Sequence, residues 1–206
     1  MARIKVLVAD DHSVVRMGLS ALLGAEGDID VVGEARNGVE AFSEAMRLKP
    51  DVVIMDLVMP KKDGVAATAE LHKALPSAKV LILTSFSTSD GISHAIKAGA
   101  AGVLMKSEEN ETLTSAIRAV HRGERVIPMN IRRLMVEDPP VPELSPRQRE
   151  ILSSITMGLS NDDIAKQLGV SKASVKTHIL LLFKKLGAAT RAEAVAIALR
   201  KHLLKI

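Results

Sequence analysis

The chain of 206 residues has no cysteine, no tryptophan and no tyrosine, and only three phenylalanines. Without cysteine it can form neither a disulfide framework nor a thiolate zinc site. It also lacks any apolar run near the roughly 20 residues of a membrane-spanning helix, and residues 1–10 are typical of a strand rather than of a charged leader. We therefore expect a cytoplasmic protein without a membrane partner, long enough for one large domain or two modest ones.

Charge is spread unevenly along the chain. Residues 1–123 carry 14 Lys and Arg against 16 Asp and Glu, a net charge of −2. Residues 124–206 carry 14 basic against 8 acidic residues, a net charge of +6, which completes the total of +4. A basic C-terminal part beside an acidic N-terminal part indicates a polyanion partner, and a basic surface that only keeps the protein in solution is the alternative at this point.

A short apolar run that ends in an aspartate is the central feature of the N-terminal part. Residues 52–55 are apolar and partly β-branched, as in a strand buried on both faces of a parallel sheet, and Asp56 follows directly. Residues 6–9 form a second such run, which ends in Asp10 and Asp11. Because ligands of open parallel sheets bind at the carboxyl ends of the strands, we expect the three carboxylates to meet at one edge.

Three carboxylates in one place favour a bound cation. Like charges repel unless a positive ion lies among them, and Mg²⁺ is a hard divalent ion that prefers oxygen ligands. Two further apolar runs would supply other groups at the same edge. Residues 80–83 end at Thr84, a hydroxyl donor, and residues 103–105 end at Lys106, a cation. Such a set can hold a phosphoryl group on Asp56.

In this order and at these positions, Asp10, Asp11, Asp56, Thr84 and Lys106 resemble the receiver domain of two-component response regulators, over about residues 3–122. The resemblance implies a flavodoxin-like α/β fold with a five-stranded parallel sheet and five helices. It also implies that a cognate histidine kinase phosphorylates Asp56, with Thr84 and Lys106 as the other catalytic residues of the acceptor site.

The same resemblance implies the metal ligands. Asp11 and Asp56 would bind Mg²⁺ directly, Asp10 through a water molecule, and Val58 through its backbone carbonyl. By contrast, His12 is expected to be an ordinary loop residue, because no second His or Cys stands near it at ligand spacing. After it, a helical stripe of apolar residues predicts a helix: Val14, Val15, Leu19, Leu22 and Leu23.

Some residues depart from the receiver pattern. The family usually has a proline that aims the lysine where this chain has Ser107, and an aromatic residue that moves during switching where this chain has Val103. We therefore expect an altered approach of Lys106, and weakened or rerouted coupling to the surface that changes on phosphorylation. Val58 and Phe86 occupy positions that tune loss of the phosphoryl group. Both are apolar and cannot orient an attacking water, so we expect slow autodephosphorylation.

Residues 123–143 are predicted to be a linker. Helical continuation is interrupted there by Gly123, Pro128, Pro139, Pro140 and Pro142. Residues 131–136, between these breakers, are compatible with a short helix. Because prolines limit flexibility, we expect that the domains at 1–122 and 144–206 are not freely tethered.

Helix signals are dense from residue 144 onwards. Ser145 and Gln148 form a capping box around a proline at the first helical position. Ser160 is predicted to cap a second helix, Gly169 to end it, and Ser171 to start a third. A short helix, a tight glycine turn and another helix are the pattern of a helix-turn-helix.

This part resembles the all-α, four-helix LuxR-type DNA-binding domain over about residues 143–204, in the segments 144–147, 158–161, 164–165, 168–171, 175–178 and 185–187. A receiver followed by such a domain is the architecture of NarL/FixJ-type response regulators. The resemblance makes residues 171–186 the recognition helix, which enters the major groove of DNA. Lys176 and Thr177 would contact base edges, whereas Lys172, Lys184 and Lys185 would contact phosphates.

Two leucines in that helix are unusual. Helical spacing predicts a core face made by Val175, Ile179, Leu182 and Leu186. Leu180 and Leu181 would then point outward, where the family usually has polar or basic residues. They would either contact thymine methyl groups or rest against another protein surface, such as the receiver of the unphosphorylated protein. The last helix, residues 192–204, is apolar enough for a dimer contact between two DNA-binding domains.

Together these features predict a transcription regulator and not an enzyme, in which phosphorylation of Asp56 lets residues 144–206 bind DNA as a homodimer. A phosphatase or phosphotransferase of the haloacid dehalogenase type is a weaker alternative, because it needs a second Asp at the position of Val58. Another alternative is a phosphate-independent DNA-binding protein that keeps the receiver for dimerisation only. Ser107 and Val103 favour that alternative, and the complete acid set opposes it.

Overall fold

The structure is a computed structural model that describes residues 3–85, 89–201 and 203–204. The chain divides into two compact units, Met1–Pro139 and Pro140–Ile206. Each unit has its own apolar core. Over the described ranges, no helix has both the length and the apolar character needed to cross a lipid bilayer.

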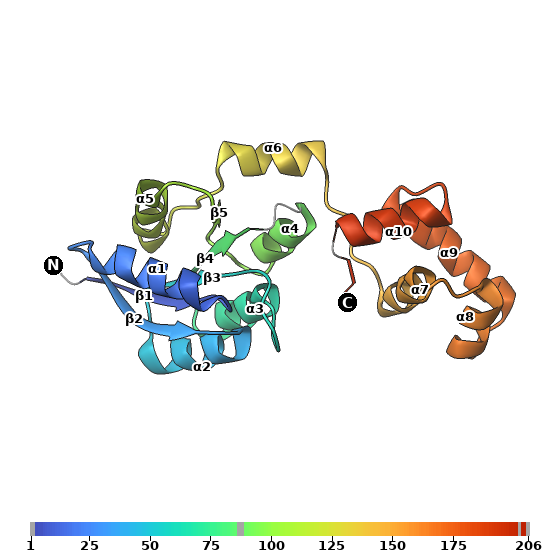
Figure 1. Ribbon diagram of the computed structural model, residues 1–206, viewed down its shortest axis with the longest axis horizontal. Coiled ribbons are helices and arrows are strands. Elements are labelled where there is room, and N and C mark those ends of the chain that lie inside the picture. Colours follow the sequence, from blue (N-terminus) through green and yellow to red (C-terminus); the bar gives the residue numbers. More distant parts are fainter. Residues whose placement is uncertain (1–2, 86–88, 202, 205–206) are drawn as a thin grey trace. The chain divides into compact units, whose positions relative to one another are not determined.

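A five-stranded sheet forms the centre of the first unit (Figure 1). Its strands are β1 (Ile4–Ala9), β2 (Ile29–Ala35), β3 (Val52–Met55), β4 (Lys79–Thr84) and β5 (Gly102–Met105). All neighbouring strands pair in parallel in the order β2-β1-β3-β4-β5, so the predicted flavodoxin-like receiver fold is confirmed. Every residue of β3 is buried, which explains why residues 52–55 are all apolar.

Helices cover both faces of this sheet (Figure 1). One face is packed by α1 (Ser13–Gly24) and α5 (Asn110–His121). The other is packed by α2 (Gly38–Leu48), α3 (Gly64–Ala74) and α4 (Ser89–Lys97). With both faces covered, the carboxyl ends of the strands are the part of the sheet that can form a site.

One residue of the stripe predicted for α1 lies elsewhere. Leu23 is fully buried, but Val14 is 80% exposed, so the placement of Val14 in the apolar face was wrong. Arg16 is buried instead. Its Nη1 donates a 2.7 Å hydrogen bond to the backbone carbonyl of Asp10, and its Nε lies 3.3 Å from Glu34 Oε2. These two contacts of Arg16, at the end of β1 and in β2, therefore turn the Arg16 side of α1 toward the sheet.

Part of the predicted linker packs against the first unit. Val126 forms a parallel bridge beside β5, and α6 (Met129–Glu137) follows it. Ile131 of α6 is 2% exposed and belongs to the same apolar cluster as residues of α4. At the start of α4, Ser89 Oγ donates a 3.2 Å hydrogen bond to Asp138 Oδ2. A strand bridge, an apolar contact and a polar contact thus join residues 126–138 to the first unit.

The described part of the second unit contains four helices: α7 (Pro146–Thr156), α8 (Asn161–Leu168), α9 (Lys172–Leu186) and α10 (Arg191–Arg200). Each begins after a side-chain cap, at Ser145, Ser160, Ser171 and Thr190 respectively. Gly169 ends α8 with φ of 63°, a left-handed conformation that glycine adopts without strain. In α10, Ala194 and Ala198 face the unit's own core, and Leu199 is 49% exposed.

Candidate functional site

Asp10 and Asp56 lie at the carboxyl ends of the adjacent strands β1 and β3. The amide of Asp56 donates to the carbonyl of Ala9 at 2.9 Å, and the amide of Asp10 donates to the carbonyl of Ala35 at 3.1 Å. Backbone pairing between the strands therefore positions both residues. Asp10 is 2% exposed and Asp56 is 4% exposed, whereas the side chain of Asp11 is 31% exposed. The cluster is open to solvent on the Asp11 side.

Lys106 reaches this cluster from the end of β5. Its Nζ lies 2.5 Å from Asp10 Oδ2 and 2.9 Å from Asp56 Oδ2. The amide of Lys106 donates to the carbonyl of Thr84 at 2.9 Å, and Thr84 is the fully buried last residue of β4. With Ser107 as its neighbour in the chain, the lysine still contacts both buried acids.

Burial and charge shift the pKa values of this group of residues. Burial raises the pKa of Asp56, and the carboxylate of Asp10 adds to the rise, while Lys106 and the amide of Leu57 oppose it without cancelling it. For Lys106, burial alone would lower the pKa, but hydrogen bonds to Asp10 and Asp56 outweigh burial and raise it. The ammonium therefore stays charged between two carboxylates that have little access to water.

The acid cluster suits a hard divalent cation. Asp10, Asp11, His12 and Asp56 each offer a ligand atom, and these atoms all lie within 4.8 Å of one another. Three carboxylates beside the Lys106 ammonium leave an excess of two negative charges, which a divalent ion would neutralise. Carboxylate oxygens are also the ligands that Mg²⁺ prefers. The donor set therefore fits the ion that the resemblance implies.

Two residues beside the cluster were not predicted to belong to the site: His12 was expected to be an ordinary loop residue, and Arg16 was not considered. Nδ1 of His12 lies 2.9 Å from Asp11 Oδ1 and 3.3 Å from Asp10 Oδ1, although the His12 side chain is 69% exposed. Its place next to the acids is its sole sequence signal. Arg16 holds the backbone carbonyl of Asp10, as described above. A basic residue in the first turn of the helix after the acids is a signal that could have found it.

Gly64 allows the loop after β3 to close over the acceptor strand. A Cβ at this position would lie 2.0 Å from the carbonyl oxygen of Asp56, which is far inside van der Waals contact. The amide of Gly64 also donates to the carbonyl of Leu57 at 2.9 Å. From the sequence, Gly64 is only a glycine in a loop. Its close approach to Asp56 arises because residues 57–64 fold back on the end of β3, which no local pattern indicates.

Two residues that depart from the receiver pattern have different outcomes. Val103 is fully buried in β5, in the apolar cluster that also contains Ile92 of α4 and Ile131 of α6. The region of α4 and β5 is therefore packed with aliphatic side chains. Phe86 lies outside the described residues. Slow autodephosphorylation stays a prediction.

In the second unit, α9 has the two faces that its periodicity predicted. Its buried side chains are Val175, Leu182 and Leu186, and Ile179 packs against the same core. The exposed residues include Lys172, Lys176, Thr177 and Lys184. Lys172 forms an ion pair of 2.7 Å with Asp162 of α8, in which both side chains are more than half exposed. The helix thus presents basic residues to solvent at its beginning and near its end.

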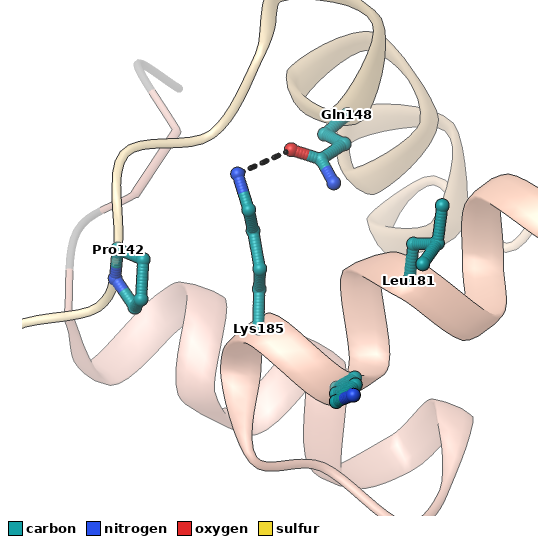
Figure 2. A pocket seen from close by; sticks show the side chains of 5 residues that line it. Pro142, Gln148, Leu181 and Lys185 are labelled. Atoms are coloured by element: carbon teal, nitrogen blue, oxygen red, sulfur yellow. Dashed lines mark hydrogen bonds between the residues drawn. The ribbon is translucent and has the colours of Figure 1, made fainter.

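Lys185 differs from the other residues predicted to contact DNA. Its Nζ donates to the carbonyl of Glu143 at 2.8 Å and to Gln148 Oε1 at 3.1 Å. Figure 2 shows this side chain reaching toward Gln148 at the start of α7, in a pocket of about 400 Å³ that is also lined by Pro142, Leu181 and Lys184. These two hydrogen bonds leave one of the three ammonium donors of Lys185 for a phosphate.

Comparison with known proteins gives a match for each unit. Residues 6–118 match the family described as "Response regulator receiver domain", and residues 142–198 match the family described as "Bacterial regulatory proteins, luxR family". The oxygen regulatory protein NreC of Staphylococcus aureus (strain JH9) is 38% identical over an alignment of 215 residues that covers 98% of this chain and 99% of NreC.

Two solved structures resemble the whole chain. The response regulator ChrA of a heme-sensing two-component system is 36% identical with a TM-score of 0.60, over 99% of this chain and 100% of ChrA. The Salmonella typhimurium response regulator RcsB, from work on conformational dynamism for DNA interaction, is 25% identical with a TM-score of 0.63, over 95% of this chain and 98% of RcsB. Both relatives therefore contain counterparts of both units.

Proposed function

Because the chain belongs to the response regulators that join a receiver domain to a LuxR-type DNA-binding domain, we propose that phosphorylation of Asp56 controls DNA binding by residues 144–206. The observation that carries this proposal is the meeting of Asp10, Asp11, Asp56 and Lys106 at the carboxyl edge of the sheet. In this role the chain regulates transcription rather than acting as an enzyme, and it works in the cytoplasm, where bacterial DNA lies.

The phosphoryl donor is a phosphohistidine of the cognate kinase. A carboxylate oxygen of Asp56 attacks the phosphorus, the phosphorus–nitrogen bond breaks, and the histidine nitrogen keeps the bonding electron pair. Asp56 then carries an acyl phosphate, a compact dianion in place of a single charge. Lys106, whose Nζ already lies 2.9 Å from Asp56 Oδ2, binds an oxygen of this group, and Thr84 donates its hydroxyl to another.

We assign Mg²⁺ to the acid cluster, where it would offset the charge on the phosphoryl oxygens. Asp11 and Asp56 would bind it directly, Asp10 through water, and Val58 through its backbone carbonyl. His12 is not assigned to the metal, since imidazole is a softer ligand than Mg²⁺ prefers. Its contact of 2.9 Å with Asp11 instead orients that carboxylate.

On the DNA side, we propose that Lys176 and Thr177 contact base edges and that Lys172 and Lys184 contact phosphates. Lys185 is a weaker candidate for a phosphate contact, because its two hydrogen bonds hold α9 to the start of α7. A homodimer formed on phosphorylation would place two copies of α9 on paired half-sites.

DNA binding by the purified full-length protein, with and without phosphoramidate and Mg²⁺, tests the proposal. The DNA is a site selected in vitro from a random pool. Phosphorylation should tighten binding by wild type and by Asp30→Ala, which removes an exposed acid on β2, but not by Asp56→Ala. Equal affinity in every sample would refute control by Asp56. It would favour a phosphate-independent regulator whose receiver serves only dimerisation.

A further inference from the structure

The outward face of α9 is a single helical stripe. Ala173, Thr177, Leu180 and Lys184 follow one another at intervals of four, three and four residues, and all four are exposed. Such spacing places side chains above one another on one side of a helix. The buried residues of α9 lie on the opposite side, so this stripe points away from the core of its own domain.

Three of the four stripe residues offer mainly methyl groups. Ala173 has only its Cβ, and Leu180 ends in two methyl groups at 73% exposure. Thr177 has a hydroxyl, but that group donates a 3.1 Å hydrogen bond to the carbonyl of Ala173 within the helix. Its proton is therefore already used, and its methyl group remains. The centre of this stripe is thus poor in hydrogen-bond donors.

The two adjacent leucines have different surroundings. Leu181 is 49% exposed and lines the pocket beside Gln148 and Lys185 at the start of α7 (Figure 2). Leu180 is more exposed and belongs to the outward stripe. An apolar side chain that is exposed to water would gain burial free energy from a surface that covers it. Leu180, and not Leu181, is the residue positioned for that contact.

Thymine is the base whose chemistry matches this stripe. In the major groove its C5-methyl group is the apolar feature that separates it from the other bases, and small apolar side chains read it by contact. From Ala173 to Leu180 the helix rises about 10 Å, at about 1.5 Å per residue. This length is comparable to about three base-pair steps. Lys184, at the end of the stripe, and Lys172, next to Ala173 in the chain, can hold the stripe against the phosphate backbone.

We propose that Ala173, Thr177 and Leu180 recognise thymine methyl groups, with Leu180 making the main contact. This inference rests on the proposed DNA binding by α9 and specifies the bases that it reads. A protein partner fits less well, because apolar patches that mark protein interfaces usually cover several hundred Å². Here the stripe has one large apolar side chain, two small ones and a lysine.

Replacement of thymine by deoxyuridine tests the proposal, since it removes the methyl group and keeps every hydrogen-bonding group. The phosphorylated full-length protein is titrated against a site selected from a random pool, made once with thymine and then with deoxyuridine at single positions. We expect wild-type affinity to fall about threefold to fivefold at a contacted thymine, as for loss of one buried methyl group. Leu180→Ala should abolish this sensitivity at one position, and Leu181→Ala should retain it.

Thr177→Ser provides a second variant that keeps the hydroxyl and removes only a methyl group. It should lose sensitivity at a thymine other than the one read by Leu180. Thermal unfolding of Leu180→Ala and of Thr177→Ser should match that of wild type, because both side chains are exposed. Binding that is unaffected by deoxyuridine, or affected equally in wild type and Leu180→Ala, would overturn the methyl contact while the proposed function stands. Absence of binding to any DNA would overturn both.

Discussion

The ammonium nitrogen of Lys106 lies 2.9 Å from Oδ2 of Asp56, although 50 positions separate the two residues in the chain. The lysine is a fixed countercharge for the proposed phospho-acceptor. Burial nevertheless keeps the pKa of Asp56 above its ordinary value. In the metal-free protein, this group therefore makes folding less favourable as pH rises from the unfolded pKa through the raised folded pKa, because the folded state holds the proton more tightly.

Lys106→Met should raise the pKa of Asp56 further, because it removes the hydrogen bond and the charge that favour the carboxylate. Asp56 would then ionise at a higher pH, and acceptor activity would be lost at a higher pH on acidification. Carboxyl ¹³C NMR titration without Mg²⁺ measures the shift. Lys97→Met, at an exposed position at the end of α4, is the control. An Asp56 titration that Lys106→Met leaves unchanged would contradict the contact.

Mg²⁺ should raise the melting temperature of the protein, because it binds the folded acid cluster and not the unfolded chain. At a concentration about ten times the dissociation constant the gain is about 1.4 kcal/mol. Asp11→Ala should lose most of this gain and Asp30→Ala should keep it. Circular dichroism is the suitable readout, since the chain has no Trp or Tyr for intrinsic fluorescence. A similar rise in wild type and Asp11→Ala would exclude Asp11 as a ligand.

Gly64→Ala should destabilise the receiver by about 1–3 kcal/mol, the usual range for forcing an extra carbon into a packed site. The added Cβ would collide with the carbonyl of Asp56, so phosphorylation should slow as well. Gly18→Ala is the matched control in α1, where a Cβ meets nothing within 4 Å. It should stabilise the protein by about 0.5–1 kcal/mol through helix propensity. Calorimetry compares the stability of the two variants. Equal changes in stability would show that residues 57–64 shift at little cost to accommodate the added Cβ.

Ile131→Ala should destabilise the first unit by about 2–5 kcal/mol, because Ile131 is buried and its loss leaves a cavity. Met129→Ala, in the same helix but at a side chain that is 77% exposed, should change stability little. Chemical denaturation of the full chain, followed by circular dichroism, measures both. If Ile131→Ala unfolded at the wild-type midpoint, α6 would be a loosely attached part of the linker rather than a part of the receiver.

Lys184 and Lys185 are neighbours with different expected roles. Lys184→Ala should weaken DNA binding and reduce the slope of log affinity against log salt by about 0.9, as for loss of one phosphate contact. Lys185→Ala should leave that slope nearly unchanged and destabilise the second unit by about 1 kcal/mol, through its hydrogen bonds to Glu143 and Gln148. Salt titrations of binding, together with thermal unfolding, separate the two effects. If Lys185→Ala instead reduced the salt slope and left stability unchanged, Lys185 would be a phosphate contact.

The order of the helices and strands could be predicted from the sequence, because it depends on local residue patterns. Residues 52–55 had to be a strand buried on both faces, and Asp56 had to stand at its carboxyl end, since a continuous apolar run of that length suits a central parallel strand. The caps at Ser145, Ser160 and Ser171 likewise appear where the sequence placed them, because capping uses residues three positions apart. Periodicity also separated the core face of α9 from its exposed face.

Tertiary structure decided what depends on residues far apart in the chain. Periodicity favoured burial of Val14, yet Arg16 is the buried residue, because the carbonyl of Asp10 is within its reach. Ile131 belongs to the receiver core because Val126 bridges to β5 and directs α6 toward α4. Lys185 forms hydrogen bonds within its own domain, because the fold brings the carbonyl of Glu143 and the side chain of Gln148 within its reach. By itself, the sequence determined which side chains stand at strand ends and on helix faces; packing alone decided the distances between them, because contacts across the fold follow no sequence period.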